Sequence, residues 1–163
     1  LMAHKNMDKK SAQKEAVEML RMVGIPEPEK RVKQYPHEFS GGMRQRVMIA
    51  IAFACDPKLL ICDEPTTALD SMTQRQIVEL LVSLVDEAGA AMLFITHDFS
   101  VLAHATQYCY VLDHGTIVEQ GRTRRVLAEP STPQGARLVM AARELTLHGA
   151  EGEGGGTRRE RAQ

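Results

Sequence analysis

The sequence predicts an α/β domain whose sheet is mainly parallel and is flanked by helices. Two short apolar runs, Leu59 to Cys62 and Ala90 to Thr96, are typical of strands, and the stretch from Asp70 or Ser71 to about Ala88 has the apolar periodicity of a helix. A helix between two strands is the connection that parallel strands need. The chain has 163 residues, 44% of them hydrophobic, so it can bury a core without disulfides.

The N-terminal part is predicted to be helical. One helix runs from Ser11 to Val23, with its apolar side chains on one face, until Gly24 ends it. A proline-containing connection follows over 25–38. The next helix, from Met43 to Cys55, is apolar on most sides, so we expect it to be buried. We also expect both apolar strands to be buried on both faces, as strands of parallel sheets usually are.

The C-terminal part is predicted to hold short helices around a β-hairpin. Strands from Tyr108 to Leu112 and from Thr116 to Glu119 are joined at Asp113–His114–Gly115, which favours a tight turn. Further helices are predicted over 99–105, 122–128 and 135–145. The glycine-rich, charged stretch 149–163 is predicted to be disordered.

Charge and composition argue against several classes of protein. The net charge is -1 and no long basic run precedes the extreme C-terminus, so a dedicated nucleic-acid binder is not expected. Cys55, Cys62 and Cys109 lack metal-ligand spacing, which favours small buried side chains in a reducing compartment. Residues 1–10 lack the apolar core of a signal peptide, and no apolar run approaches the roughly 20 residues that span a bilayer. A membrane link is therefore expected only through a partner.

Ser40–Gly41–Gly42 opens the helix that follows it. Serine is a good N-cap, the first amides of a helix are unpaired, and the helix dipole favours an anion there. Glycines let the backbone approach a phosphate without an obstructing Cβ. Taken alone, the pattern is weak evidence, because Ser-Gly-Gly before a helix is usually an ordinary cap and turn.

Asp63 and Glu64 end the apolar strand that begins at Leu59. Ligands of open parallel sheets lie beyond the carboxyl ends of the strands. A carboxylate at that place suits Mg²⁺, and a second one can orient or deprotonate an attacking water. The alternative is that the two acids are simply exposed to solvent at the end of a strand. The sequence Pro-Thr-Thr-Ala-Leu-Asp that follows them favours a functional site instead.

Two more residues are candidates by position. His97 follows the second strand and is expected at the same sheet edge as Asp63 and Glu64, where an imidazole could hydrogen-bond a terminal phosphate. Asp70 is expected to cap the following helix, a role that leaves a second one possible.

Four stretches together resemble a known family. Tyr35 to Arg46, which reads Tyr-Pro-His-Glu-Phe-Ser-Gly-Gly-Met-Arg-Gln-Arg, resembles the signature region of ABC transporter ATP-binding subunits. Leu59 to Glu64 resembles their Walker B strand, Ala68 to Asp70 their D-loop, and Thr96 to Asp98 their switch-histidine loop. All four occur in the family's order. The residues of these motifs are similar to those in the ATP-binding subunits of dipeptide, oligopeptide and nickel importers.

The resemblance implies a partial P-loop NTPase domain and a role for each candidate residue. Ser40–Gly42 would contact the γ-phosphate of ATP held by an opposite subunit. Asp63 would hold Mg²⁺, Glu64 would position the hydrolytic water, and His97 would sense the γ-phosphate. Asp70 would help to couple the two sites of a head-to-tail dimer.

The resemblance also implies an organisation and a set of partners. Residues 1–56 would be part of the helical signature subdomain, 57–121 part of the RecA-like core, 122–148 a helical extension and 149–163 a tail. The expected partners are a second ABC ATPase subunit, transmembrane permease subunits and, indirectly, a solute-binding protein. The expected place is the cytoplasmic face of the bacterial inner membrane, with ATP hydrolysis energising the uptake of peptides or nickel.

The phosphate loop of the family, Gly-x-x-x-x-Gly-Lys-Ser/Thr, does not occur in this sequence, and neither does its glutamine loop. ATP then lacks its main anchor, so we predict that the chain alone binds ATP weakly and does not hydrolyse it. The first residue is Leu, which hints at the C-terminal portion of a longer protein. The remaining portion should supply strands, so we expect an uncovered sheet edge, an exposed apolar surface and poor solubility in isolation.

Two other functions stay open at this point. One is a soluble ABC ATPase of DNA repair or translation, although such proteins tend to carry long insertions or tandem cassettes, which this chain lacks. The other is a non-catalytic interaction module whose signature acts only in trans. Intact Glu64 and His97 weigh against it.

Overall fold

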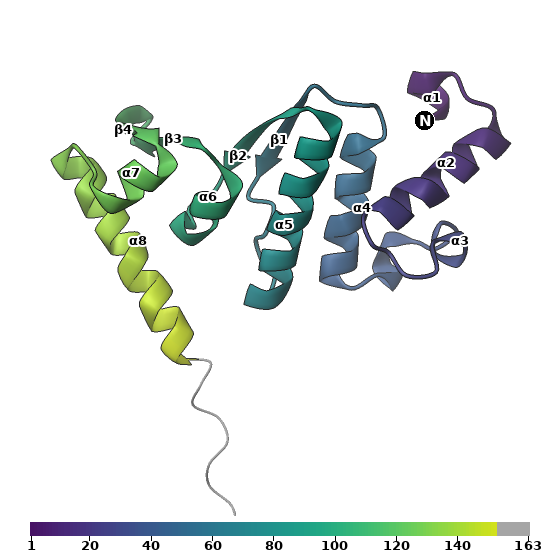
Figure 1. Cartoon of the computed structure of the whole chain (residues 1–163). Helices are drawn as coiled ribbons and strands as arrows, with labels where there is room; N and C mark the ends of the chain where they lie inside the picture. The colour runs from purple at the N-terminus through teal and green to yellow at the C-terminus, as the bar shows by residue number, and fades with distance from the viewer. Residues whose placement is uncertain (153–163) are drawn as a thin grey trace, which may run out of the picture. The chain divides into compact units, whose positions relative to one another are not determined.

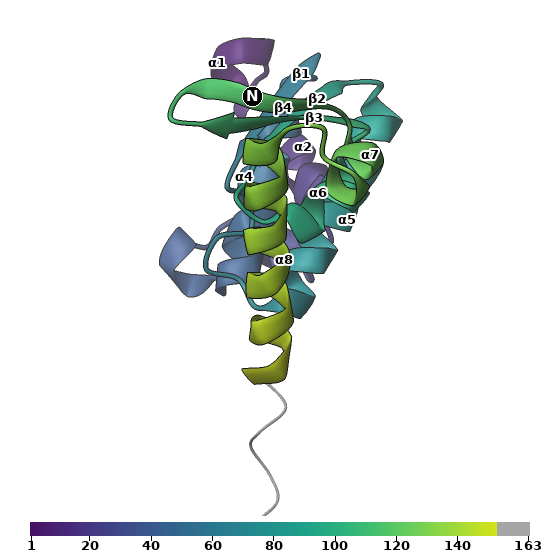
Figure 2. The same cartoon turned by 90° about the vertical axis from the view of Figure 1, so that its left-hand side faces the viewer.

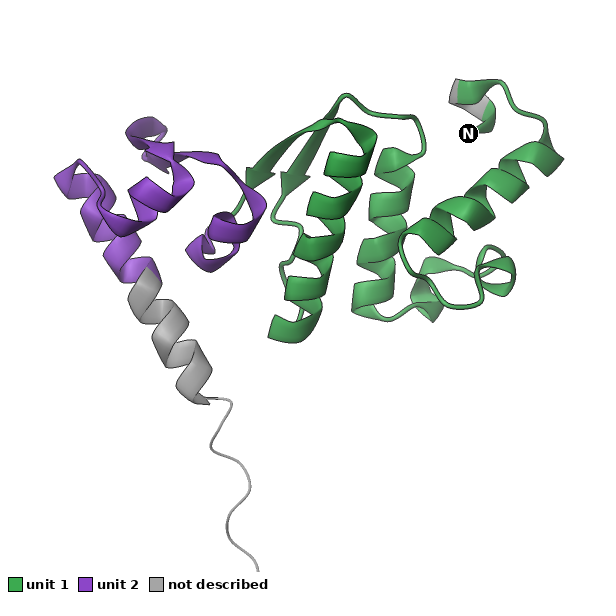
Figure 3. Cartoon of the chain, in the orientation of Figure 1, with its two compact units in different colours: residues 1–96 green, residues 97–163 purple. Residues whose placement is uncertain are grey.

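The computed structural model describes the backbone of residues 1–152 and the side chains of the same stretch except residues 3, 4 and 143–152. The chain forms two compact units, residues 1–96 and 97–163 (Figure 3). The boundary falls inside the stretch 57–121 that the sequence predicts to be one core. The predicted subdomain limits stay predictions.

The first unit combines helices with one pair of strands. In chain order its elements are α1 (Met2–Lys5), α2 (Lys9–Met22), α3 (Pro28–Arg31), the 3-10 turn η1 (Pro36–Glu38), α4 (Gly41–Phe53), β1 (Leu59–Asp63), α5 (Ser71–Ala88) and β2 (Ala91–Ile95). β1 and β2 are parallel, with Leu59 opposite Ala91 and Asp63 opposite Ile95. The predicted strand–helix–strand unit is therefore confirmed, with α5 as its crossover (Figure 1).

Local capping sets the ends of the helices in this unit. α2 begins two residues before its predicted start because Asp8 Oδ1 accepts hydrogen bonds from the amides of Lys10 and Ser11, at 2.9 and 3.1 Å. Gly89, in the left-handed conformation at φ 60°, ends α5 where the sequence predicts. The proline-containing connection holds two short helical turns, α3 and η1, that the sequence did not predict.

Burial in the first unit is one-sided, which corrects two predictions. Leu60, Cys62 and Phe94 are buried, but Leu59 and Ile61 on the other face of β1 are 54% and 61% exposed. Helix α4 likewise buries only part of its surface, and Ile51 on it is 67% exposed. The expectation that β1 and α4 are buried on all sides is wrong for the described residues, because none of them covers the outer face of either element. The predicted exposed apolar surface is thereby confirmed.

The second unit is a β-hairpin with helices packed against it. Its elements are α6 (Phe99–Ala105), β3 (Tyr108–Asp113), β4 (Thr116–Arg122), α7 (Thr123–Ala128) and α8 (Pro133–Gly152). The hairpin is antiparallel, as predicted, and α7 and α8 lie on the same side of it (Figure 2). Its small core consists of buried Cys109, Val111 and Val126, against which Phe99, Val118 and Leu138 pack.

The last helix extends beyond its predicted end. α8 continues to Gly152, so residues 149–152 are helical and the prediction of a disordered tail is wrong there. A helix lengthens at little cost once it is nucleated, since each further residue adds one hydrogen bond. The rest of the predicted tail, 153–163, lies outside the described residues.

A buried carboxylate fixes the start of α8. Glu119, on β4, is 5% exposed. Its carboxylate accepts hydrogen bonds from the amides of Gln120, Ser131 and Thr132 and from the Arg125 guanidinium, which lies 3.2 Å away. One acid thus ties a strand to the loop that leads into α8. Sequence analysis missed it, because a single acid in a strand carries no local signal of burial.

Candidate functional site

The start of α4 has the cap that the sequence predicts. Ser40 is the N-cap residue, and its Oγ accepts a hydrogen bond from the amide of Met43 at 3.3 Å. Ser40 and Gly41 are exposed. The first turn of this helix of 13 residues contains no acidic residue that would oppose an anion.

The two glycines of this stretch pack against the segment that leads into α5. A Cβ added to Gly42 would lie 2.8 Å from Thr73 Cγ2, a distance that real Cβ atoms do not reach. A Cβ on Gly41 would lie 3.7 Å from Leu69 Cδ2, in ordinary contact. Glycine is therefore required at position 42 for the close approach of the two helix starts. The fold thus brings Ser40–Gly42 beside Thr73 and beside Leu69, which belongs to the predicted motif Ala68 to Asp70. These stretches lie far apart in sequence.

Asp63 and Glu64 lie at the carboxyl end of β1, as predicted. Asp63 is the last residue of the strand and is exposed, and the amide of Glu64 donates to the carbonyl of Ile95 at 2.9 Å. Glu64 has a φ of 47°, a left-handed conformation that is uncommon for residues other than glycine. Strained backbone of this kind is concentrated at functional sites. The turn directs the chain away from the sheet directly after the two acids.

The loop after Glu64 holds its side chain in place. Thr67 donates twice to Glu64, from its hydroxyl to Oε2 and from its amide to the backbone carbonyl, both at 3.2 Å. Pro65 and Thr66 are buried, and the amide of Leu69 donates to the carbonyl of Thr66 at 3.2 Å. Glu64 is therefore a half-buried carboxylate at a sheet edge, positioned by its own loop.

Asp70 caps α5. Its Oδ1 accepts from the amide of Thr73 at 2.9 Å and its Oδ2 from the hydroxyl of Thr73 at 2.7 Å. The side-chain and backbone hydrogen bonds from Thr73 lower the pKa of Asp70, so it is a carboxylate near neutral pH. The predicted capping role is confirmed, and its part in coupling two nucleotide sites stays a prediction.

His97 is the first residue of the second unit and comes two residues after the end of β2. The next residue, Asp98, caps α6, because its Oδ1 accepts from the amide of Ser100 at 2.9 Å. The role of His97 toward a phosphate stays a prediction.

Mg²⁺ fits this site only together with a ligand. The described residues contain no group of three or more His, Cys, Asp or Glu side chains that could hold a metal ion. Mg²⁺ is, however, commonly bound through one or two carboxylates with phosphate oxygens and waters as its other ligands. Asp63, exposed at the carboxyl end of β1, provides one such carboxylate.

Arg46 is a positioning residue that sequence analysis missed. Its Nη1 donates to the carbonyl of Val23 at 2.7 Å, and its Nη2 lies 3.5 Å from Oε1 of Gln76. Arg46 thus joins α4 to the end of α2 and to α5. No local signal distinguished Arg46 from Arg44 and Gln45, which precede it in the same polar run.

The cysteines divide into two kinds. Cys62 and Cys109 are buried, as predicted, and burial raises the pKa of Cys62 to about 11. Burial also raises the pKa of Cys109, so both thiols are protonated near neutral pH. Cys55 is exposed, so the prediction of burial is wrong for it, because it lies after the last turn of α4.

The helices described up to residue 152 include none long and apolar enough to span a bilayer.

Comparison with known proteins supports the resemblance. The sequence family described as "ABC transporter" matches residues 1–67. The oligopeptide transport ATP-binding protein OppD of Bacillus subtilis is 48% identical over 151 residues, which cover 93% of this chain and 42% of that protein. OppD of Salmonella typhimurium is 50% identical over 151 residues, which cover 93% of this chain and 45% of that protein. The chain thus spans less than half the length of these relatives.

Solved structures give the same fold. A dimeric bacterial ABC transporter cassette superposes with a TM-score of 0.61 at 34% identity, covering 72% of this chain and 50% of that one. The same cassette in a post-hydrolysis state, bound to ADP and Pi, superposes with a TM-score of 0.62. The chain therefore has the fold of part of an ABC ATPase cassette, a P-loop NTPase domain, and over most of its length its sequence is similar to part of the ABC transporter ATP-binding proteins. In particular, it is similar to the ATP-binding proteins of oligopeptide and dipeptide transport.

Proposed function

We propose that this chain is part of the ATP-binding and ATP-hydrolysing subunit of an ABC importer that energises peptide uptake. The observation that carries the proposal is the placement of Glu64. Its carboxylate follows Asp63 at the end of a parallel strand and accepts a hydrogen bond from Thr67 at 3.2 Å. The names of the relatives, oligopeptide and dipeptide transport ATP-binding proteins, favour peptides as the solute.

Two carboxylates in sequence can serve two roles in phosphoryl transfer. Asp63 would be a Mg²⁺ ligand, and the ion would supply charge neutralisation on the phosphates. Glu64 would orient the attacking water and accept its proton, a task for which its loop already positions it. The strained turn at Glu64 is consistent with a position selected for chemistry rather than for stability.

The start of α4 would bind the phosphate of a second nucleotide. Ser40 and Gly41 are exposed, and the amides that open α4, together with the positive end of the helix dipole, suit a γ-phosphate presented by another ATPase subunit. The dimeric cassette to which this chain is similar supports such a pairing. His97 would hydrogen-bond the γ-phosphate, and Asp70 would help to couple the two sites while capping α5.

Transport would need further proteins. We propose that permease subunits bind the ATPase pair at the cytoplasmic face of the membrane and that a solute-binding protein delivers the peptide. Residues 1–56 would form part of the helical signature subdomain, 57–121 part of the RecA-like core, and the following helices an extension.

The test is ATP hydrolysis by the complete subunit reconstituted with its permease, with Glu64→Gln compared with the unsubstituted protein. Loss of a general base lowers turnover by about 10²- to 10⁴-fold, and ATP binding should persist because Glu64 is not a phosphate anchor. Glu79→Gln is the matched control, since Glu79 is an exposed acid of α5 that pairs with Arg75 at 2.9 Å. Turnover that survives Glu64→Gln would refute the assignment. The 163-residue chain alone should show no turnover, because its sequence lacks the phosphate loop.

A further inference from the structure

The starts of α4 and α5 pack against each other through one threonine. A Cβ added to Gly42, on the first turn of α4, would lie 2.8 Å from Cγ2 of Thr73, on the first turn of α5. Both residues are half-buried. The methyl group of Thr73 therefore fills the space that a side chain at position 42 would need.

The same side chain also holds Asp70. The hydroxyl of Thr73 donates to Oδ2 of Asp70 at 2.7 Å, and the amide of Thr73 donates to Oδ1 at 2.9 Å. The hydroxyl and the methyl group of a threonine rotate together about one bond, so fixing the hydroxyl also fixes the methyl group. The hydrogen bond to Asp70 therefore orients the methyl group toward Gly42. Serine lacks this methyl group and valine lacks the hydroxyl, so neither residue can do both.

A second contact continues the same packing one turn further along each helix. Arg46 follows Gly42 by one turn on α4, and Gln76 follows Thr73 by one turn on α5. Nη2 of Arg46 lies 3.5 Å from Oε1 of Gln76. The two helices thus lie side by side (Figure 1), and the contact of Gly42 with Thr73 is where their packing begins.

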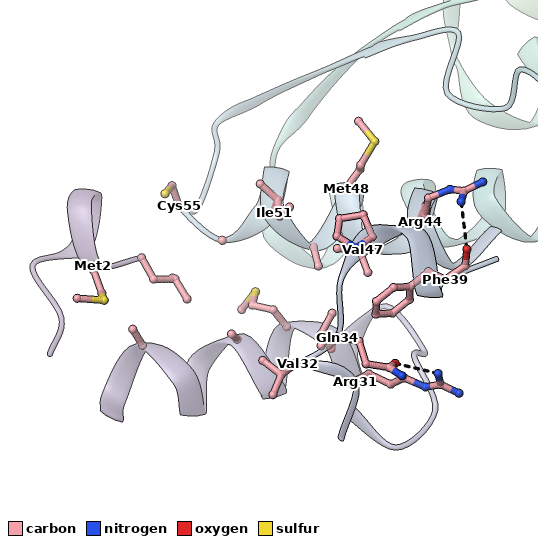
Figure 4. A pocket seen from close by; sticks show the side chains of 18 residues that line it. Met2, Arg31, Val32, Gln34, Phe39, Arg44, Val47, Met48, Ile51 and Cys55 are labelled. Atoms are coloured by element: carbon pink, nitrogen blue, oxygen red, sulfur yellow. Dashed lines mark hydrogen bonds between the residues drawn. The ribbon is translucent and has the colours of Figure 1, made fainter. Parts of the chain in front are cut away.

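The residues just before α4 are held by that helix itself. Nη1 of Arg44 donates to the carbonyl of Phe39 at 3.2 Å (Figure 4), and the side chain of Phe39 is buried. This hydrogen bond fixes the segment around Ser40 relative to α4, but it does not relate that segment to α5. Thr73 provides the second relation, because its methyl group lies against Gly42 while its hydroxyl binds Asp70.

We propose that Thr73 is a positioning residue that holds the start of α4 at a fixed place relative to Asp70. The inference rests on the proposed function, in which Ser40–Gly42 bind a phosphate and Asp70 couples two nucleotide sites. Because one side chain contacts both groups, a displacement of Asp70 displaces Ser40–Gly42 with it. Thr73 acts through these two groups and not by touching the nucleotide.

Moving the methyl group from one side of the contact to the other tests this geometry. Gly42→Ala puts two methyl groups in the space of one, so we expect urea unfolding to give a folding equilibrium constant at least about fivefold lower. Thr73→Ser removes the other methyl group and keeps the hydroxyl. The double variant again has one methyl group there, so its constant should exceed that of Gly42→Ala by about fivefold. Gly41→Ala is the control for helix propensity and should cause no loss, since its Cβ would lie 3.7 Å from Leu69, in ordinary contact.

ATP turnover by the complete subunit, reconstituted with its permease, tests the positioning role. We expect Gly42→Ala to lower kcat per folded subunit at least about tenfold, and the double variant to recover it to within about twofold of the unsubstituted protein. The KM for ATP should change less than about twofold, because Thr73 contacts no nucleotide. Thr73→Val, which keeps a methyl group but loses the hydroxyl, should also lower kcat. Ser83→Ala is its matched control and should leave kcat unchanged, since the hydroxyl of Ser83 donates to Glu87 at 2.9 Å further along α5.

Three outcomes overturn the proposal. The first is a double variant whose loss of stability is the sum of the losses of the two single variants. The second is a double variant that recovers stability but not kcat. The third is a kcat of Thr73→Val equal to that of the unsubstituted protein. A complete subunit that does not hydrolyse ATP even without substitutions would contradict the proposed function instead, and the unfolding measurements would still decide whether Thr73 holds the two helix starts together.

Discussion

The two strand pairs of this protein are each buried on one face only, but the consequence of the open face differs between them. In β1 the exposed and buried residues alternate, with Leu60 and Cys62 buried, and in β3 they alternate likewise, with Cys109 and Val111 buried. β1 and β2 are parallel, whereas β3 and β4 are an antiparallel hairpin. Antiparallel sheets commonly face water on one side, but parallel sheets occur almost only with both faces covered.

This difference indicates which part of the chain is structurally incomplete. The hairpin can keep Tyr108, Tyr110 and Leu112 on a water-facing side and still be a stable element. The open face of β1 and β2 requires another layer, and β1 ends at Asp63, directly before Glu64. The part of the chain that holds the candidate chemistry therefore depends most on a covering layer that the described residues do not supply.

The largest effect should come from the buried face of β1. Leu60→Ala removes a side chain that is 7% exposed, so it should lower the free energy of unfolding by about 2–5 kcal/mol. Ile61→Ala, one residue further on and 61% exposed, should change it by no more than about 0.5 kcal/mol. Urea unfolding of both variants checks this. Equal losses of unfolding free energy for the two variants would mean that the outer face of β1 is already covered. β1 would then not differ from the hairpin in the way described above.

The next effect concerns the hairpin's own support. Glu119→Gln leaves one acceptor oxygen where the carboxylate has two, so the amides of Ser131 and Thr132 or the pair formed by Gln120 and Arg125 lose their acceptor. We expect a Tm lower by several degrees and faster hydrogen exchange either at the amides of Ser131 and Thr132 or at the amide of Gln120, with β1 and β2 unaffected. Slower or unchanged exchange at all three amides would contradict the role given to Glu119.

The stabilisation that Glu119 provides depends on pH with a definite sign. Burial by itself raises the pKa of Glu119, but the hydrogen bonds from Thr132, Ser131, Gln120 and Arg125 outweigh it and lower the pKa below its ordinary value of 4.5. Stabilisation from a lowered pKa is fully present above pH 4.5 and is lost as the pH falls through the native value. Acid melting curves of the protein and of Glu119→Gln should therefore converge as the pH falls below that range.

The smallest effect is expected at a local cap that depends on neither strand pair. Ser40→Ala removes the hydrogen bond to the amide of Met43, which is long at 3.3 Å, and should cost about 0.5–1 kcal/mol of stability. Ser40→Asp should restore the cap, since Asp and Ser are equally good N-cap residues. The measurement is again urea unfolding. A loss as large as that of Leu60→Ala would mean that α4 is held mainly by its first turn.

Much of the candidate site could be predicted because its parts depend on nearby residues. Ser40 and Asp70 cap the helices that follow them, and Asp63 ends β1, as expected from their place beside apolar runs. The proximity of Gly42 to Thr73 could not be predicted, because it depends on how two helices pack. The left-handed turn at Glu64 had no local signal either, since glutamate has no preference for it.

The sequence by itself determined most of the helices and strands, the order of the motifs and the placement of two carboxylates at the end of a strand. Caps, turns and hydrophobic periodicity act over a few residues, so they can be read along the chain. Only the tertiary structure decided which strand faces are buried, that Arg46 joins three helices, and that Glu119 receives hydrogen bonds from residues 12 and 13 positions away. Burial and packing depend on which distant segments are present to cover a surface, and sequence spacing does not contain that information.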